Sequence, residues 1–371
     1  MKNINGHQLI GIFERFAPKY LAMEGDKIGL QIGRLNKPVQ KVMVALDVLE
    51  EVVDEAIVKG VDLIIAHHPL IYRPLKNITT DQLPGRMIEK LIKHDIAVYA
   101  AHTNLDVAKG GVNDLLASAL ELTDTEALVP THEVKLKKLV VFVPVSDSQK
   151  VKEAMGDAGA GAIGNYSHCL FSVEGTGQFL PNEDSNPYIG QGGQLEQVEE
   201  ERVETIFPEY LEKSVLQAML KAHPYEEVAY DIYSLENKGE TLGLGRVGKI
   251  EEMTLAEFAN KVKRALEVPT VRVVGDLNAK VKKVAVLGGD GNKYISSAKF
   301  KGADVYVTGD LYYHVAHDAM MMGLNVIDPG HNVEKIMKKG IAHSLTKVCS
   351  EKGYNVEIFP SEERTEPFQF L

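Results

Sequence analysis

The sequence predicts an α/β protein: two duplicated α/β halves that form one domain, interrupted by a βαββαβ insert of the ferredoxin-like plan. Three observations lead to this prediction. Buried apolar runs alternate with helical stretches in the first and last thirds of the chain. These two thirds align with each other, at one offset before the polar loop and a smaller one after it. The middle third has a different order of elements.

The first third alternates strands with helices. Apolar runs predict strands and helical periodicity predicts helices, in the order 41–46, 48–59, 61–66, 85–94 and 96–100. Gly60 ends the first of these helices. The resulting βαβαβ order implies a mostly parallel sheet that is covered by helices on both faces.

The last third repeats this order, with strands at 283–287, 304–307 and 324–327 and helices at 292–299 and 311–322. The first two strands and the helix between them align with the first third at an offset of 242 residues. The third strand aligns at an offset of 228, because the second copy lacks the insertion from Pro74 to Pro84. Three strands that align in order indicate a duplicated half.

The middle third reads as a βαββαβ unit, with strands at 138–145, 165–177, 202–207 and 228–235 and helices at 148–158 and 209–223. Gly and polar residues cluster near Pro130 and between Gly239 and Gly248, so we expect the edges of the insert there. The expected limits are 1–129 and 241–371 for the two halves and 130–240 for the insert.

The composition is that of a soluble globular protein with more than one domain: 371 residues, 44% apolar and 25% charged, with a net charge of −11. An acidic chain repels phosphate backbones, so we do not expect nucleic acid as a partner. The apolar runs are too short to cross a bilayer and the start lacks an apolar leader, so we expect no membrane partner. The two cysteines exclude a disulfide framework and fit a cytoplasmic location.

Two adjacent histidines, His67 and His68, follow the second predicted strand. Binding sites in open parallel sheets form beyond the carboxyl ends of the strands. Pro69 restricts His68 to extended conformations, and adjacent side chains on an extended segment point in different directions. The pair therefore suits two metal ions better than one. A pair of ordinary polar loop histidines is the alternative interpretation.

Two carboxylates and a third histidine occupy equivalent loops of the two halves. Asp106 follows the third strand and could bridge two cations, or else cap the helix that begins near Asn113. His331 and Glu334 are three residues apart, a spacing that places both on one face of a helix, although such a pair alone is usually solvated. Because Asp106 aligns with Glu334 at the offset of 228, we favour a shared site.

These residues predict a site for two divalent metal ions per chain. A mixed set of imidazoles and carboxylates suits Zn, with Mn, Fe, Ni or Co as alternatives, better than Ca. Two such ions can ionise bound water near neutral pH and stabilise a developing oxyanion. The candidate ligands are His67, His68, Asp106, His331 and Glu334.

Three further residues are candidate catalytic groups. Asp310 occupies the position of His68 in the duplicate, where it could orient a ligand imidazole, act as a base or cap a helix. His314 lies four residues later and could move a proton, and His102 is a candidate beside the ligands. The glycine-rich segment 288–292 could hold an anion with its amides, although a tight turn is the preferred interpretation.

Five segments of the two outer thirds resemble the NIF-three family, also described as GTP cyclohydrolase I type 2 homologues. They are Gly29-Leu30-Gln31-Ile32-Gly33, Ala66-His67-His68-Pro69, His102-Thr103-Asn104-Leu105-Asp106, Thr308-Gly309-Asp310 and Gly330-His331-Asn332-Val333-Glu334. The resemblance implies a dinuclear metal site between two similar halves, with its ligands at the five positions above, and a toroidal homohexamer. The segment Ala222-His223-Pro224-Tyr225-Glu226-Glu227 resembles the PII- and CutA-like insert of longer members, which implies regulatory caps over the openings of the ring.

The leading functional hypothesis is a divalent-metal hydrolase that acts on a small, nucleotide-like substrate. The family name points to GTP ring opening, in which metal-bound hydroxide attacks the purine C8 and formate is released. The alternative is a non-catalytic ring that binds metal as a carrier, sensor or scaffold, and the regulatory relatives of the insert favour it. Turnover of a substrate panel by the metal-loaded protein separates the two.

Overall fold

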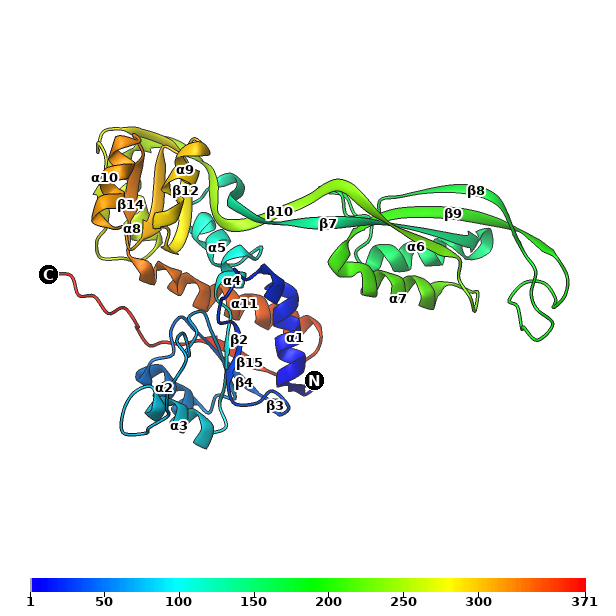
Figure 1. Ribbon diagram of the computed structural model, residues 1–371, viewed down its shortest axis with the longest axis horizontal. Coiled ribbons are helices and arrows are strands. Elements are labelled where there is room, and N and C mark those ends of the chain that lie inside the picture. The colour runs from blue at the N-terminus through cyan, green and yellow to red at the C-terminus, as the bar shows by residue number, and fades with distance from the viewer. Residues whose placement is uncertain (1) are drawn as a thin grey trace. The chain divides into compact units, whose positions relative to one another are not determined.

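The computed structural model describes residues 2–371 and divides the chain into two compact units. Unit 1 comprises the residues up to His132 together with residues 242–371, and unit 2 comprises residues 133–241. The chain passes between the units through two long strands, β7 (Thr123–Pro144) and β10 (Tyr230–Thr254) (Figure 1). The α/β class expected from the sequence is confirmed.

The first sheet of unit 1 has the strand order β15-β4-β5-β6-β2. Its members are β15 (Glu357–Pro360), β4 (Lys41–Ala45), β5 (Leu63–Ala66), β6 (Ala97–Ala100) and β2 (Gly29–Ile32). The first four are parallel, and β2 runs antiparallel to β6 at the edge. The sequence predicted β4, β5 and β6 but neither edge strand. A small sheet of β1 (Ile4–Asn5) and β3 (Pro38–Val39) precedes them.

Helices cover both faces of this sheet (Figure 1). On one face, α2 (Glu50–Lys59) and α3 (Gly85–Lys93) pack with Met43 and Ile64. On the other face, α1 (Gly6–Phe16) and α11 (Ile336–Glu351) pack with the alternate residues of the same strands. Because both faces are buried, the central strands are apolar throughout rather than alternating, which is why they were readable in the sequence.

The second sheet of unit 1 is built around three parallel strands, β12 (Lys280–Asp290), β13 (Val305–Gly309) and β14 (Asn325–Asp328). β10 pairs antiparallel with β12, and β11 (Arg272–Val274) pairs antiparallel with β14. The helices packed on it are α5 (Val112–Ala119), α8 (Leu255–Ala265), α9 (Ile295–Phe300) and α10 (Tyr313–Met321). Descent of the two sheets from one duplicated half stays a prediction.

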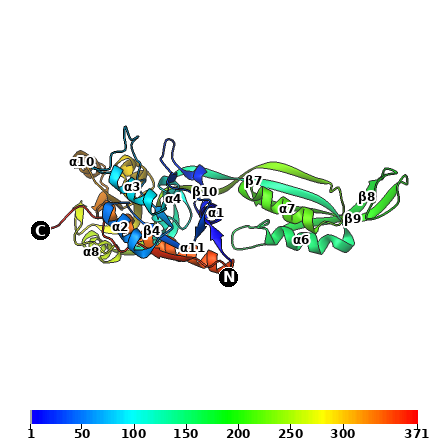
Figure 2. The ribbon, with the colours of Figure 1, turned by 90° about the horizontal axis from the view of Figure 1, so that it is seen from below.

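Unit 2 contains, in chain order, part of β7, α6 (Ser148–Asp157), β8 (Leu170–Phe179), β9 (Glu196–Pro208), α7 (Glu212–Ala222) and part of β10. β9 pairs antiparallel with both β7 and β8. The helices α6 and α7 contact each other and bury one face of these strands in a separate core (Figure 2). Assignment of this unit to the ferredoxin-like plan stays a prediction.

The expected edges of the middle segment, near Pro130 and between Gly239 and Gly248, lie within β7 and β10, and the two units divide in these strands at residues 132/133 and 241/242. A Cβ atom on Gly239 would lie 2.1 Å from the carbonyl oxygen of Val134, and one on Gly243 would lie 2.0 Å from that of Val129. The glycines therefore let the two strands approach closely. Among residues 2–371, no helix has both the length and the apolarity needed to cross a bilayer.

Candidate metal centre

Six polar side chains of unit 1 converge from the carboxyl ends of its parallel strands. Two follow β5, two follow β6 and two follow β14. The pair after β6 surrounds the start of the short helix α4 (Thr103–Val107), and the pair after β14 lies in the 3-10 turn η5 (His331–Lys335). The six are His67, His68, His102, Asp106, His331 and Glu334.

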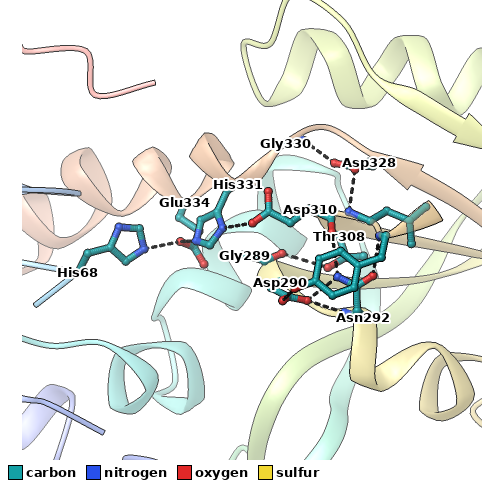
Figure 3. Close-up of polar contacts among 12 residues, drawn as sticks. His68, Gly289, Asp290, Asn292, Thr308, Asp310, Asp328, Gly330, His331 and Glu334 are labelled. Atoms are coloured by element: carbon teal, nitrogen blue, oxygen red, sulfur yellow. Dashed lines mark hydrogen bonds and ion pairs between the residues drawn. The ribbon is translucent and has the colours of Figure 1, made fainter. Parts of the chain in front are cut away.

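Glu334 lies at the middle of the cluster. Its Oε2 atom is 3.1 Å from Nε2 of His68 and 3.2 Å from Nε2 of His331, so the two rings flank one carboxylate (Figure 3). The same oxygen is 3.7 Å from Nε2 of His67, which in turn is 3.6 Å from Oδ1 of Asp106. Two groups of three candidate ligand atoms, each within 4.8 Å of one another, share Glu334. A shared carboxylate is the arrangement that can bridge two ions.

All four imidazoles are oriented in the same way by a hydrogen bond at Nδ1. The acceptors are Ala101 O for His67 at 3.0 Å, Asp47 Oδ1 for His68 at 2.6 Å, Asp310 Oδ2 for His331 at 2.6 Å and Asp26 Oδ1 for His102 at 2.9 Å. Because a carbonyl or a carboxylate only accepts, Nδ1 carries the hydrogen in each ring. Each Nε2 is therefore the atom left to bind a metal ion once its proton is displaced, which is the arrangement of metal-ligating histidines.

Two buried polar atoms of the cluster have no hydrogen-bond partner among residues 2–371. They are Nε2 of His67, whose side chain is fully buried, and Oδ1 of Asp106. Leaving such atoms unpaired costs roughly 1–3 kcal/mol each. A cation held between them would satisfy both at once, so the donor set fits a metal ion.

The electrostatics of the cluster also call for added positive charge. Burial alone would lower the pKa of His68, but hydrogen bonds to Asp47 and Glu334 outweigh it and raise that pKa to about 10. The hydrogen bond to Glu334 likewise raises the pKa of His331 to about 9. Burial, reinforced by the nearby Glu334 charge, raises the pKa of Asp106 to about 6. The carboxylates therefore hold protons on the imidazoles, and divalent cations would replace those protons.

All five predicted metal ligands lie in this cluster. The alternative role of Asp106 as a helix cap is not what the structure shows, since the N-cap of α5 is Gly111 and has no side-chain hydrogen bond. Asp310 does not cap α10 either, because the N-cap there is Tyr312. Instead Asp310 accepts the hydrogen bond from His331 (Figure 3).

The other two predicted catalytic residues differ in position. His102 lies in the cluster, with its ring centroid 5.3 Å from that of His67. His314 is an exposed residue of α10 whose ring contacts Tyr313 at 5.4 Å, and none of the described contacts joins it to the cluster. A proton-moving role for His314 stays a prediction.

Sequence reasoning missed the carboxylates that orient His68 and His102. Asp47 directly follows the first predicted strand, so the rule that sites form beyond strand ends could have found it. Asp26 accepts from His102 and from the backbone N–H of Thr103, but it precedes a strand that the sequence did not reveal. No pattern in the neighbouring sequence indicated this role for Asp26.

The glycine-rich segment after β12's apolar run serves the cluster through its lack of side chains. A Cβ atom on Gly289 would lie 2.7 Å from Oε1 of Glu334, and the φ angle of this residue is +62°. Gly288 would bring a Cβ atom to 3.0 Å from the same oxygen. The glycines therefore make room for the Glu334 carboxylate, a role that the sequence interpretation as a tight turn did not include.

Comparisons with known proteins agree on one family. The family model described as Duf34/NIF3 (NGG1p interacting factor 3) matches residues 4–367. A Bacillus subtilis protein named GTP cyclohydrolase 1 type 2 homolog is 64% identical over 371 residues and is covered, like this chain, over 100% of its length. The crystal structure of a Bacillus cereus protein related to NIF3 superposes with a TM-score of 0.93 at 64% identity, with 100% of both chains covered. A Staphylococcus aureus protein structure gives 0.73 at 33% identity, again over 100% of both chains.

Proposed function

The chain belongs to the Duf34/NIF3 family, and we propose that it is a dinuclear-metal-dependent hydrolase acting on a small nucleotide-like substrate. The observation that carries this proposal is the facing pair of unpartnered buried atoms, His67 Nε2 and Asp106 Oδ1, at the centre of a histidine and carboxylate cluster. No described hydrogen bond satisfies either atom, and a divalent ion of a hydrolytic site would satisfy both.

The residues of the cluster divide into those that would hold the metal ions and those that orient the ligand side chains. His67, Asp106 and Glu334 would hold one divalent ion, and His68 and His331 would share Glu334 to hold a second. When bound, the ions would activate water and stabilise negative charge that develops on a substrate oxygen or nitrogen. We propose Zn first for this donor set, with Mn, Fe, Ni or Co as alternatives.

The groups that accept a hydrogen bond from Nδ1 orient the imidazole rings. Asp310 and Asp47 fix the ring planes of His331 and His68, so that neither ring must be reoriented when a ligand binds. His102 presents an Nε2 atom to the same space and is fixed by Asp26. This histidine lies where it could accept or return a proton during turnover.

We propose GTP as the first substrate to test, because curated relatives carry the name GTP cyclohydrolase 1 type 2 homolog. The reaction would open the purine imidazole ring by hydrolysis at C8 and release that carbon as formate. The experiment is a formate assay with protein loaded with each metal, with His67→Ala as the variant that should lose metal.

The possible outcomes distinguish metal binding at the cluster from hydrolase activity. Formate release that depends on both metal and His67 supports the full proposal. Metal bound by the wild type and lost by His67→Ala, with no turnover of GTP or of a panel of nucleotides, overturns the hydrolase and favours a non-catalytic metal-binding ring. Two equivalents of metal per chain are expected by elemental analysis, and a single equivalent would contradict the dinuclear site.

We also propose a ring-shaped homohexamer, as the family resemblance implies. Sedimentation equilibrium tests it, with an expected mass of six chains. A monomer or dimer at micromolar concentration would contradict this assembly.

A further inference from the structure

A cavity of about 880 Å³ lies within unit 2 and is built from that unit alone. It is lined by β8, by β9, by the loop that joins them, by the segment after α7 and by Phe142 of β7. Its volume falls in the range of small-molecule sites, roughly 300–1,000 Å³. We propose that this cavity binds a small organic cation, in which an ammonium group is attached to an apolar or aromatic body.

The cavity uses the sheet face that the helices leave uncovered. Side chains alternate along β9, and Glu201 and Val203 point to the helical side, where Ser148 of α6 donates to Glu201 at 2.8 Å and Val203 joins the core. Glu200 and Arg202 therefore point to the opposite side, and both line the cavity. The polar face of this sheet is part of a hollow rather than an open surface.

Glu200 is the buried anion of the cavity. Its side chain belongs to a residue that is only 9% exposed, and its Oε1 atom accepts a hydrogen bond from the Tyr225 hydroxyl at 3.0 Å. Among the described residues, no lysine or arginine forms an ion pair with it. A Cβ atom on Gly177 would lie 2.1 Å from Oε2, so the carboxylate occupies space that only glycine provides. A buried carboxylate with a single hydroxyl donor is poorly compensated and would gain from a cation.

Three aromatic rings stand beside this carboxylate. The Tyr225 ring lies 5.8 Å from that of Phe179 and 6.3 Å from that of Tyr188, measured between centroids. All three residues line the cavity. Aromatic faces attract ammonium groups by about 0.5–2 kcal/mol, and more so when water is excluded. The apolar walls then suit the body of the ligand, and the carboxylate suits its charge.

The remaining charges of the lining favour a cation over an anion. Four carboxylates and one guanidinium line the cavity: Glu174, Glu200, Glu226 and Glu227 with Arg202. The guanidinium of Arg202 is engaged by Glu204 at 2.9 Å, outside the lining. A metal ion is a poorer occupant, because the groups of described residues that could hold one all lie in unit 1.

The test uses the full-length protein and two probes that share a benzyl group, benzyltrimethylammonium as the cation and benzyl alcohol as the neutral control, with calorimetric titration. We expect the cation to bind at least about tenfold more tightly than the alcohol. Glu200→Gln should abolish this preference, because the amide keeps the acceptor for Tyr225 but removes the charge. Glu199→Gln is the matched control, since this exposed neighbour on β9 does not line the cavity and should bind as the wild type does.

A second variant tests the same point without removing the charge. In Gly177→Ala the added methyl group would displace the Glu200 carboxylate, so cation affinity should again fall by about tenfold. Equal affinities for the two probes, or wild-type binding by Glu200→Gln, would overturn the proposal. The proposal would also be overturned if the wild type bound neither probe and Glu200→Gln changed the sedimentation coefficient. That result would indicate that the cavity face forms a contact between copies of the chain.

Discussion

At the residue scale, the centre depends on pairs in which one side chain positions another. Asp310 has a φ angle of +53° and accepts from His331 at 2.6 Å, so a strained residue holds a candidate ligand in place. Strain of this kind is retained where the surrounding structure needs it.

We predict that Asp310→Asn lowers metal affinity by about 10–100-fold while leaving the fold intact. Asparagine tolerates the same backbone region, but its amide no longer provides a charged acceptor for the His331 N–H. Competition with a chromophoric chelator measures the change. Asp318→Asn, at an exposed position of α10, is the control and should bind metal normally. Unchanged affinity in Asp310→Asn would contradict its positioning role.

A buried histidine in unit 2 gives a pH prediction. His223 donates from Nε2 to the Phe142 carbonyl at 2.9 Å and accepts at Nδ1 from the Tyr225 N–H at 3.1 Å, so the fold requires the neutral ring. Burial lowers its pKa below the ordinary value of 6.5. As the pH falls, the unfolded chain therefore takes up a proton on His223 before the folded chain does. The stability that the neutral His223 ring contributes is fully present above pH 6.5, and it is lost as the pH falls toward the pKa of the folded state.

The measurement is thermal unfolding of the full chain between roughly pH 7 and pH 5. Wild-type unit 2 should lose stability over this interval, and His223→Gln should show a smaller dependence, even if it is less stable throughout. An equal slope in both proteins would show that other groups control this pH range.

At the residue scale, the clustering of the candidate ligands was predictable because a histidine pair and a three-residue His/Glu spacing leave a local pattern. The orienting groups were not. Asp26 and the backbone carbonyl of Ala101 act through contacts 76 and 34 residues away in sequence. Such contacts exist only after the chain has folded.

At the element scale, the close approach of β7 and β10 depends on glycine. We predict that Gly239→Ala destabilises unit 2 by about 1–3 kcal/mol, because the new methyl group would meet the Val134 carbonyl oxygen. Gly175→Ala in β8 is the control, since a Cβ atom there has no neighbour within 4 Å. Calorimetric unfolding compares the two variants. If both variants lose the same free energy of unfolding, the contact between β7 and β10 is not the cause.

Elements with two buried faces were predictable, and elements at edges were not. β4, β5 and β6 have every residue or nearly every residue buried, which leaves continuous apolar runs. β2 mixes exposed and buried positions and β15 has one exposed and three half-buried residues, and at four residues each both are too short for a periodic signal.

At the scale of the whole molecule, the hydrophobic cores are separate. Two clusters are built from unit 1, and a third, which includes Val141, Val203 and Met219, belongs to unit 2 alone. Because the candidate metal ligands all lie in unit 1, metal binding should stabilise one unit and leave the other unaffected.

We predict two calorimetric transitions for the metal-loaded protein. Chelation should lower the midpoint of the unit 1 transition by roughly 10 °C and leave that of unit 2 in place. Gly239→Ala identifies the unit 2 transition, because its methyl group disturbs only that unit. A single transition that moves as a whole would show instead that the units unfold together.

The path of the chain between the units has a consequence for engineering. β7 and β10 are neighbours in one sheet, and the Thr131 hydroxyl reaches the Leu242 carbonyl at 3.5 Å, so the chain leaves unit 1 and re-enters it at almost the same place. Excising residues 133–241 and joining His132 to Leu242 with a short turn would thus convert two long strands into a plain hairpin. Unit 2 could thus be gained or lost in one genetic step without rerouting the rest of the chain.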